Sequence, residues 1–397
     1  MNKLSSSVTR SVRAGVESDE HHGAVIPPLH LSSNFTFAGF AEPRRYDYTR
    51  SGNPTRDALG DAIADLEEGA GASITCSGMA AITLVSQLLG PNDLLIAPHD
   101  CYGGTFRLFR SLAEKKQIAV EFVDQTDGQA LAAALAKSPK ILWIETPSNP
   151  LLRIVDVQQL AAAAHAVDAL VVVDNTFLSP ALQQPIKLGA DIVVHSTTKY
   201  LNGHSDVVGG AVVSATDELA ESLRYWSNCI GVSGAPFDSY LTLRGIRTLH
   251  ARVRQHEENA QRVAESLAAD RRVEHVYYPG LPDDPGHELA SRQQSGFGGM
   301  VSFDLKGGES AVRAFVESLR HFSLAESLGG VESLVCHPSS MTHAPLSHAA
   351  KKAAGIGPGL VRLSVGIEHG DDLLEDIGNA LDIAAASCEE DIRVAII

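Results

Sequence analysis

Short apolar runs alternate with segments of helical periodicity through the first half of the chain. The apolar runs lie at 94–97, 119–123, 141–144 and 170–173, and the helical segments at 105–115, 129–136 and 157–167. Strands that alternate with helices in this way form a parallel sheet whose two faces are both covered by helices. The pattern therefore predicts an α/β fold with a mainly parallel central sheet.

The residues before this region predict an arm, a helix and a strand-to-helix turn. Residues 1–55 are interrupted by proline and glycine and predict an irregular arm, which should lie on the body or on a neighbouring subunit. Apolar residues at helical spacing then predict a helix over 56–67. A short strand near 74 leads directly into a helix over 80–89.

The C-terminal third has a different pattern. Helices are predicted over 217–228, 310–319 and 373–386, and a long, charged helical region over 240–268. Strands are predicted over 273–278, 299–305 and 360–366, the last with alternating exposure. At 397 residues the chain exceeds the usual size of a single core. We expect an N-terminal arm (1–55), a large domain (56–248) and a smaller α+β domain (249–397).

Charge and cysteine content narrow the function classes. A net charge of −16 argues against nucleic-acid partners and against binding to anionic membranes. No apolar run is long enough to span a bilayer, and the first fifteen residues lack the apolar segment of a signal peptide. The 5 cysteines form no Cys-x-x-Cys pair, as expected for reduced thiols. These features predict a cytoplasmic protein.

A lysine stands between two predicted buried strands. The run Ile192–Val194 ends in hydroxyl residues before Lys199, and a second run covers 207–213. A charged lysine is costly to bury, so it is either solvated or functional. Ser196 and Thr198 could donate hydrogen bonds to an anion, and the Lys199 amine could condense with an aldehyde, which suits pyridoxal phosphate. The alternative is a polar turn with a solvated lysine.

Other residues suit the same cofactor. Gly78 and Met79 follow a strand and open a helix, where free N–H groups bind anions; the alternative is a simple connection. Asp174 ends a buried strand and could keep a pyridine nitrogen protonated, or could cap a turn. Tyr102 could lie flat on the cofactor ring or simply pack in its turn.

Two further features belong to the C-terminal domain. Arg362 alternates with apolar residues on a strand, so it is either salt-bridged or a clamp for a carboxylate. The segment Glu326-Ser327-Leu-Gly-Gly330 is a glycine-hinged loop that could face the same cleft.

Two other kinds of site can be weighed. Ser196 to Lys199 also fits the S-x-x-K motif of serine acyl-transfer enzymes, but the partner motifs of those enzymes are missing. A metal site could use Cys336, His337, His343 and His348, but their spacing matches no zinc pattern, and we predict no metal. His204 is expected to have a structural role.

Seven motifs occur in order along nearly the whole chain. They are Tyr48-Thr-Arg50 with Asn53-Pro54-Thr55, Ser77-Gly78-Met79, Asp100-Cys-Tyr102-Gly-Gly, Glu145-Thr-Pro-Ser-Asn-Pro150, Asp174-Asn-Thr-Phe177, His195-Ser-Thr-Thr-Lys199-Tyr-Leu-Asn-Gly-His204 and Glu326-Ser-Leu-Gly-Gly-Val-Glu-Ser-Leu334. This set resembles the Cys/Met-metabolism family of pyridoxal-phosphate enzymes. The resemblance implies the aspartate-aminotransferase fold, also called fold type I.

The resemblance also implies a role for each candidate. Lys199 would form the Schiff base with pyridoxal 5'-phosphate and move protons, Asp174 would hold the ring nitrogen, and Tyr102 would stack on the ring. The remaining cofactor contacts would come from Gly78, Met79, Ser196, Thr198 and Asn149, and from Tyr48 and Arg50 of the neighbouring subunit's arm. The substrate contacts would come from Arg362, which clamps the α-carboxylate, with Asn149, Ser327, Glu326, Arg107 and Tyr48. Family members are usually homotetramers built from two dimers.

The implied reaction is a γ-replacement that joins an O-acyl-L-homoserine and L-cysteine to give L-cystathionine, in the transsulfuration route to methionine. A glutamate at the Glu326 position accompanies γ-chemistry, whereas β-lyases generally carry an aromatic residue there. The close alternative is a lyase that degrades cystathionine by γ-elimination. Ser51 stands where related synthases carry a second arginine, and Arg107 remains as a possible partner, so the acyl group (succinyl or acetyl) is left open.

Overall fold

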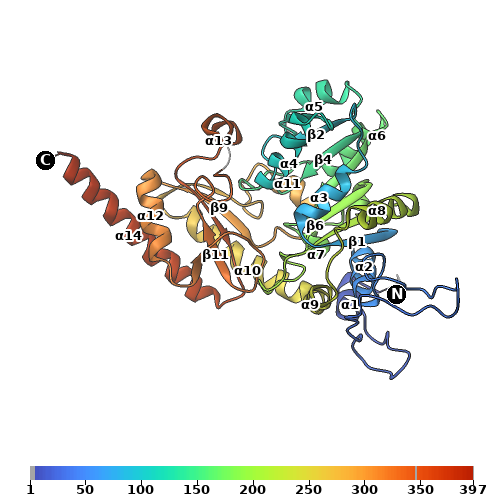
Figure 1. The fold of residues 1–397 in the computed structure, drawn as a ribbon. Helices are drawn as coiled ribbons and strands as arrows, with labels where there is room; N and C mark the ends of the chain where they lie inside the picture. Colours follow the sequence, from blue (N-terminus) through green and yellow to red (C-terminus); the bar gives the residue numbers. More distant parts are fainter. Residues whose placement is uncertain (1–4, 345–346, 397) are drawn as a thin grey trace. The chain divides into compact units, whose positions relative to one another are not determined.

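The computed structural model describes residues 5–344 and 347–396 and divides into two compact units (Figure 1). The first contains the chain up to Pro98, Arg107–Glu145 and Asp156–His250. The second contains the residues from Ala251 onward together with two short segments from the first half of the chain, His99–Phe106 and Thr146–Val155. Among the described residues, every helix is too short or too polar to cross a bilayer.

The first unit is built on a seven-stranded sheet in the order β1-β7-β6-β5-β4-β2-β3. Its strands are β1 (Gly71–Thr75), β2 (Leu94–Pro98), β3 (Ala119–Val123), β4 (Ile141–Glu145), β5 (Leu170–Asp174), β6 (Ile192–Ser196) and β7 (Gly210–Ser214). The strands from β3 across to β6 pair in parallel, and only β7 runs antiparallel to its neighbours. The predicted α/β fold with a mainly parallel sheet is confirmed.

Helices cover both faces of this sheet. They are α1 (Ser7–Val12), α2 (Pro54–Glu67), α3 (Gly78–Ser86), α4 (Gly103–Glu114), α5 (Gly128–Leu135), α6 (Val157–His165), α7 (Ser179–Leu182), the 3₁₀ turn η1 (Pro185–Leu188), α8 (Asp217–Ile230) and α9 (Pro236–Ile246). Val194 of β6 packs in a core with residues of α3, whereas the next side chain, His195, contacts Glu67 of α2. Because side chains alternate along a strand, α2 and α3 lie on opposite faces.

Two predictions in the first unit need correction. The arm expected to be irregular contains the helix α1, whose Arg10 donates to the carbonyl oxygen of Asp65 at 2.6 Å. The long helical region expected over 240–268 is divided into two helices, α9 and α10 (Leu249–Ala268). Gly245, just before the break, lies so close to the loop after β6 that a Cβ there would be 2.2 Å from the carbonyl oxygen of Asn202. This contact is tertiary and leaves no mark in the helical periodicity.

The second unit contains a five-stranded sheet in the order β10-β11-β12-β9-β8. Its strands are β8 (Val273–Tyr277), β9 (Met300–Leu305), β10 (Phe322–Leu324), β11 (Ser333–Cys336) and β12 (Leu360–Ser364), and its further helices are α11 (His287–Gln293), α12 (Gly308–Ser318), α13 (His348–Ala354) and α14 (Gly370–Ile396). One apolar core joins residues of α10, α12 and α14 to all five strands.

The exposure predicted for β12 is wrong, because all five of its residues are buried. Val361 and Leu363 belong to the main core of the second unit. On the other face, Leu360 packs against Leu151, and Arg362 bonds to Asn149, so the segment Thr146–Val155 covers that face. A segment distant in sequence therefore buries a face that the local pattern predicts to be exposed.

Candidate functional site

The lysine lies in a hydrogen-bonded turn that follows β6. The N–H of Lys199 donates to the carbonyl oxygen of Ser196 at 3.3 Å, and the Lys199 carbonyl oxygen accepts from the N–H of Gly203 at 2.8 Å. The side chain of Thr198 closes the same turn, since its hydroxyl bonds to both the N–H (3.0 Å) and the carbonyl oxygen (3.2 Å) of Gly209. The backbone thus holds Lys199 at the end of the sheet.

A donor set for an anion lies beside this turn. The helix α3 begins at Gly78, and Ser77 caps it by accepting the N–H of Ala80 at 3.0 Å. A Cβ at Gly78 would lie 2.8 Å from the Cβ of Ser196, so only glycine allows the two to approach this closely. The first N–H groups of a helix have no intrahelical acceptor. Those of Gly78 and Met79, with the Ser196 hydroxyl next to them, fit a phosphate.

Asp174 ends β5, one strand away from the lysine strand. It pairs in register with Val194, so its carboxylate lies on the same face of the sheet as α3. The N–H of Thr176 donates to Oδ1 at 3.0 Å. Burial raises the pKa of Asp174, and the hydrogen bonds from Thr176 and the charge of His195 oppose that rise. A partly buried carboxylate in this position is suited to a cationic partner such as a protonated ring nitrogen.

Behind Asp174 and Ser196 lies a buried polar network whose central residue, Glu67, lies in none of the motifs. Oε1 of Glu67 contacts Nε2 of His195 at 2.7 Å and accepts Nδ2 of Asn175 at 2.7 Å. Both partners immediately adjoin a predicted site residue, so Glu67 holds the two strand ends in place from the opposite face. The sequence does carry a signal for this network. His195 ends an otherwise apolar strand, and because side chains alternate along a strand, it must lie on the face opposite to Val194 and Ser196.

Three predicted residues lie at the surface of the first unit. Tyr48 is 49% exposed, and the Arg50 guanidinium carbon lies 5.8 Å from the centre of its ring. Nη1 of Arg50 bonds to both the carbonyl oxygen and the side-chain oxygen of Asn228, each at 2.7 Å. Arg107 is exposed on α4. Their predicted contacts with a cofactor or substrate stay predictions.

The second unit brings the predicted carboxylate clamp together. Arg362 is 3% exposed, and its Nη1 donates to Oδ1 of Asn149 at 2.8 Å and its Nη2 to the carbonyl oxygen of Ser327 at 3.1 Å. Ser327 has a φ of +93°, a strained conformation of the kind found at functional sites. Both of these acceptors are neutral oxygens. A buried cation held by neutral acceptors is suited to an anionic ligand.

Two further predicted site residues of the second unit, Glu326 and Tyr102, are more exposed than Arg362. Glu326 is exposed beside Ser327. Tyr102 is 42% exposed and lies in the segment His99–Phe106, which belongs to the second unit although the strand before it belongs to the first. Tyr102 therefore belongs to the same compact unit as Arg362.

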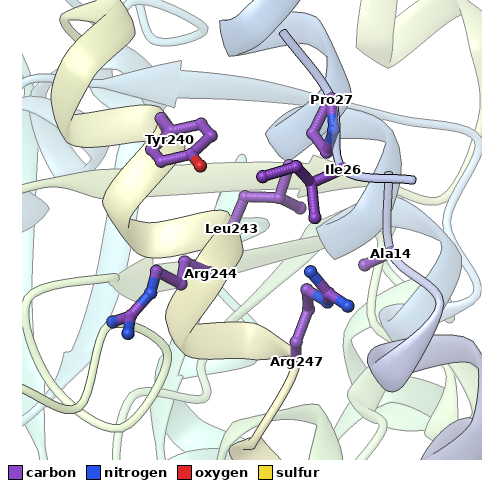
Figure 2. A pocket seen from close by; sticks show the side chains of 7 residues that line it. All are labelled: Ala14, Ile26, Pro27, Tyr240, Leu243, Arg244 and Arg247. Atoms are coloured by element: carbon purple, nitrogen blue, oxygen red, sulfur yellow. The ribbon is translucent and has the colours of Figure 1, made fainter. Parts of the chain in front are cut away.

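A cavity elsewhere in the first unit is unrelated to these residues (Figure 2). It has a volume of about 140 Å³ and lies between the N-terminal arm and α9, with Tyr240, Leu243, Arg244 and Arg247 on one side and Ala14, Ile26 and Pro27 on the other. None of the predicted site residues lines it. In the part of the chain that is described, no three histidine, cysteine or acidic side chains come together as a metal site.

Comparison with known proteins gives a consistent result. Residues 8–382 match the family model of Cys/Met metabolism PLP-dependent enzymes. Cystathionine gamma-synthase of Escherichia coli (strain K12) is 54% identical over 95% of this chain and 98% of its own length. Cystathionine beta-lyase of Lactococcus lactis subsp. cremoris (strain MG1363) is 48% identical over 96% of this chain and 100% of its own length.

Solved structures agree with these relatives. Cystathionine gamma synthase from Xanthomonas oryzae pv. oryzae, in complex with aminoacrylate and cysteine, is 59% identical over 96% of this chain and 99% of its own, with a TM-score of 0.96. Cystathionine gamma-lyase from Lactobacillus plantarum, complexed with L-serine, is 40% identical over 96% of this chain and 100% of its own, with a TM-score of 0.93. The chain belongs to the Cys/Met metabolism family of PLP-dependent enzymes, and its cofactor is pyridoxal phosphate.

Proposed function

We propose that the protein joins an O-acyl-L-homoserine and L-cysteine to form L-cystathionine, the activity of a cystathionine gamma-synthase, in methionine biosynthesis. The observation that carries the proposal is the likeness to the Xanthomonas oryzae pv. oryzae synthase, 59% identical over 96% of the chain, which was also solved in complex with cystathionine. The 54% identical Escherichia coli relative supports the same activity.

The first unit supplies the residues that would hold the cofactor. Gly78, Met79, Ser196 and Thr198 would hold its phosphate, and Asp174 would hold its ring nitrogen. When bound and held protonated, pyridoxal phosphate withdraws the negative charge that develops when a substrate C–H bond breaks. The partly buried Asp174 carboxylate would favour the protonated nitrogen, because a cation beside it is a stabilising partner. From the second unit, Tyr102 would contribute an aromatic ring to the cofactor site.

The remaining residues bind the substrate and move protons. Lys199 would be the residue that holds the cofactor through its amine, and the same amine would take the proton from the substrate Cα and later return it. Arg362 binds the α-carboxylate with both guanidinium nitrogens that now contact Asn149 and Ser327. Glu326, Arg107 and Tyr48 contact the rest of the substrate.

The net reaction is a displacement at the substrate Cγ. The ester C–O bond breaks and the acyl group leaves as its carboxylate, while a bond forms between Cγ and the cysteine sulfur. The cysteine thiol loses its proton. Ser51 in place of an arginine removes one cation that could bind a succinyl carboxylate, so both the succinyl and the acetyl ester belong in the assay.

A second candidate is the γ-elimination of cystathionine. The 40% identical lyase of Lactobacillus plantarum, with a TM-score of 0.93, supports it. The test is a product assay with each ester, with and without cysteine, and with cystathionine alone. We expect cystathionine to form faster than it is degraded. Faster release of 2-oxobutanoate from cystathionine would make the protein a γ-lyase, and release of pyruvate would make it a β-lyase.

We also propose a cytoplasmic homotetramer of two dimers, in which Tyr48 and Arg50 reach the cofactor phosphate of the neighbouring subunit. The exposure of Tyr48 supports this, since an aromatic ring at the surface is available to a second chain. Light scattering on the purified protein measures the mass of the assembly. In the tetramer, Arg50→Ala should weaken cofactor binding, whereas a monomer with full activity contradicts the proposal.

A further inference from the structure

Two short segments leave the first unit and join the second. The strands that precede them, β2 and β4, end at Pro98 and Glu145 in the first unit, whereas His99–Phe106 and Thr146–Val155 belong to the second. One segment carries Tyr102 and the other carries Asn149. The contacts that tie the two segments together therefore decide where these side chains lie relative to Arg362.

One side chain makes most of these contacts. Oδ2 of Asp100 accepts Nη1 of Arg153 at 2.6 Å and the hydroxyl of Ser148 at 3.0 Å. Asp100 is 7% exposed, so both bonds are largely shielded from solvent. Nη2 of Arg153 donates in addition to the carbonyl oxygen of Ala354 at 3.1 Å, at the end of α13. A single guanidinium thus joins both segments to α13.

The segment 146–155 has further attachments. The hydroxyl of Ser302 donates to the carbonyl oxygen of Pro150 at 2.6 Å, Leu151 packs against Ala354, and Asn149 accepts Arg362. In the segment 99–106, Asp100 accepts side-chain hydrogen bonds from Ser148 and Arg153. Loss of the Arg153 contact removes the charged bond between the two segments, whereas Ser302, Leu151 and Arg362 still hold the segment that carries Asn149.

We propose that Arg153 and Asp100 form a positioning pair that sets the Tyr102 segment against the Asn149–Arg362 clamp. Neither residue touches the reacting atoms; each acts through a neighbour, Tyr102 two residues beyond Asp100 and Asn149 next to Ser148. The inference rests on the proposed function only in the role given to Tyr102. It goes beyond that function because it assigns a task to two residues outside the site.

The test compares Arg153→Met with Arg153→Lys in the cofactor-loaded enzyme. Displacing Tyr102 by about 1 Å should lower kcat/KM by about 10- to 100-fold. The cofactor should bind several-fold more weakly, and its visible absorption band should shift. Arg153→Lys keeps the charge but cannot reach both Asp100 and Ala354, so it should restore only part of each effect.

A matched control separates positioning from stability. Arg272 also joins two acceptors within the second unit, Asp270 (2.6 Å) and Asp382, and is 26% exposed against 31% for Arg153. Arg272→Met should lower the thermal midpoint comparably while cofactor affinity, absorption band and kcat/KM stay at wild-type values. Equal kinetic losses in Arg153→Met and Arg272→Met would overturn the proposal, as would an Arg153→Met enzyme with unchanged affinity and spectrum.

A double-mutant cycle tests the pairing itself. Arg153→Met leaves a buried carboxylate without its cation, and Asp100→Asn in addition removes that charge. Asp100→Asn/Arg153→Met should therefore bind the cofactor more tightly than Arg153→Met alone, and strictly additive effects would overturn the pairing. Cofactor affinity is measured without substrate, so this test does not depend on the proposed reaction. A wild-type enzyme that makes no cystathionine would contradict the proposed reaction, and the affinity test could still be carried out.

Discussion

Asp174 and Ser196 end adjacent parallel strands in the first unit, whereas Asn149 and Asp100 lie outside any strand in the second and are held by side-chain bonds. A strand end is positioned by a ladder of backbone hydrogen bonds, which no single side-chain change removes. The clamp depends on bonds such as that of Arg362 to Asn149, which one substitution deletes. The first unit should therefore be sensitive to changes at the backbone, and the second to changes of polar side chains.

The largest effect is expected from Gly210→Ala in the first unit. A Cβ there would lie 2.3 Å from the carbonyl oxygen of Ser77, the residue that caps α3. Backbone cannot yield as a flexible side chain does, so we expect the free energy of unfolding to fall by about 3 kcal/mol, measured by denaturant titration. Gly128→Ala, where a Cβ meets open space, is the control and should change stability little. Equal losses of unfolding free energy in Gly210→Ala and Gly128→Ala would contradict the view that backbone packing at Gly210 stabilises the first unit.

The next largest effect is expected from Arg362→Lys in the second unit. Lysine cannot form the two separate bonds that the guanidinium makes to Asn149 and Ser327. We expect the KM for the acyl-homoserine to rise by about 100-fold through the loss of charged hydrogen bonds to the carboxylate. Steady-state kinetics measures this, with Arg292→Lys, an exposed site on α11, as the control. An unchanged KM would place the carboxylate elsewhere.

Acid should weaken the second unit through a buried histidine. Burial lowers the pKa of His256 to about 4, and its Nδ1 contacts the carbonyl oxygen of Val365 at 2.7 Å. The unfolded chain takes up a proton near pH 6.5 that the folded chain does not, so the stability from neutral His256 is constant above that pH and falls as pH drops toward 4. At pH 5 the loss should be about 2 kcal/mol.

The measurement is the difference in unfolding free energy between pH 7 and pH 5. His256→Gln should show a smaller loss than wild type, because it removes the titrating group. The exposed His275→Gln should lose as much as wild type. In the first unit, by contrast, the buried His195 is paired with the Glu67 carboxylate. If His256→Gln loses as much unfolding free energy between pH 7 and pH 5 as the wild type does, His256 is not the group responsible.

The smallest effect is expected from Ser302→Ala, which removes one of several attachments of the segment 146–155. Its hydroxyl donates to the carbonyl oxygen of Pro150 at 2.6 Å. Thermal unfolding should show that the free energy of unfolding falls by about 1 kcal/mol, the usual net contribution of one hydrogen bond. KM should stay close to wild type because Leu151 and Asn149 still hold the segment. The control is Ser323→Ala, at an exposed strand position, which should change neither the free energy of unfolding nor KM.

The pattern of apolar and polar residues was sufficient to place the helices and strands that have strong periodicity. The strand β3 was predicted at its observed bounds, and the strands β2, β4, β5 and β8 were predicted within a residue of theirs. Short elements such as α7, β10, β11 and α13 were missed, because three to seven residues carry too little periodicity to distinguish a helix or strand from a turn. The break between α9 and α10 was also missed, since a tertiary contact at Gly245 accompanies it.

The sequence alone determined the residues whose chemistry is local. Lys199, Asp174 and the Gly78 turn were recognisable because a strand end, a helix start and the residue type there already specify what each can do. Only the tertiary structure decided that Asn149 accepts a hydrogen bond from Arg362, that Glu67 bonds to Asn175 and His195, and that Arg153 ties Asp100 to α13. These pairs are separated by up to 213 residues, and no local periodicity records a contact that depends on how distant segments pack.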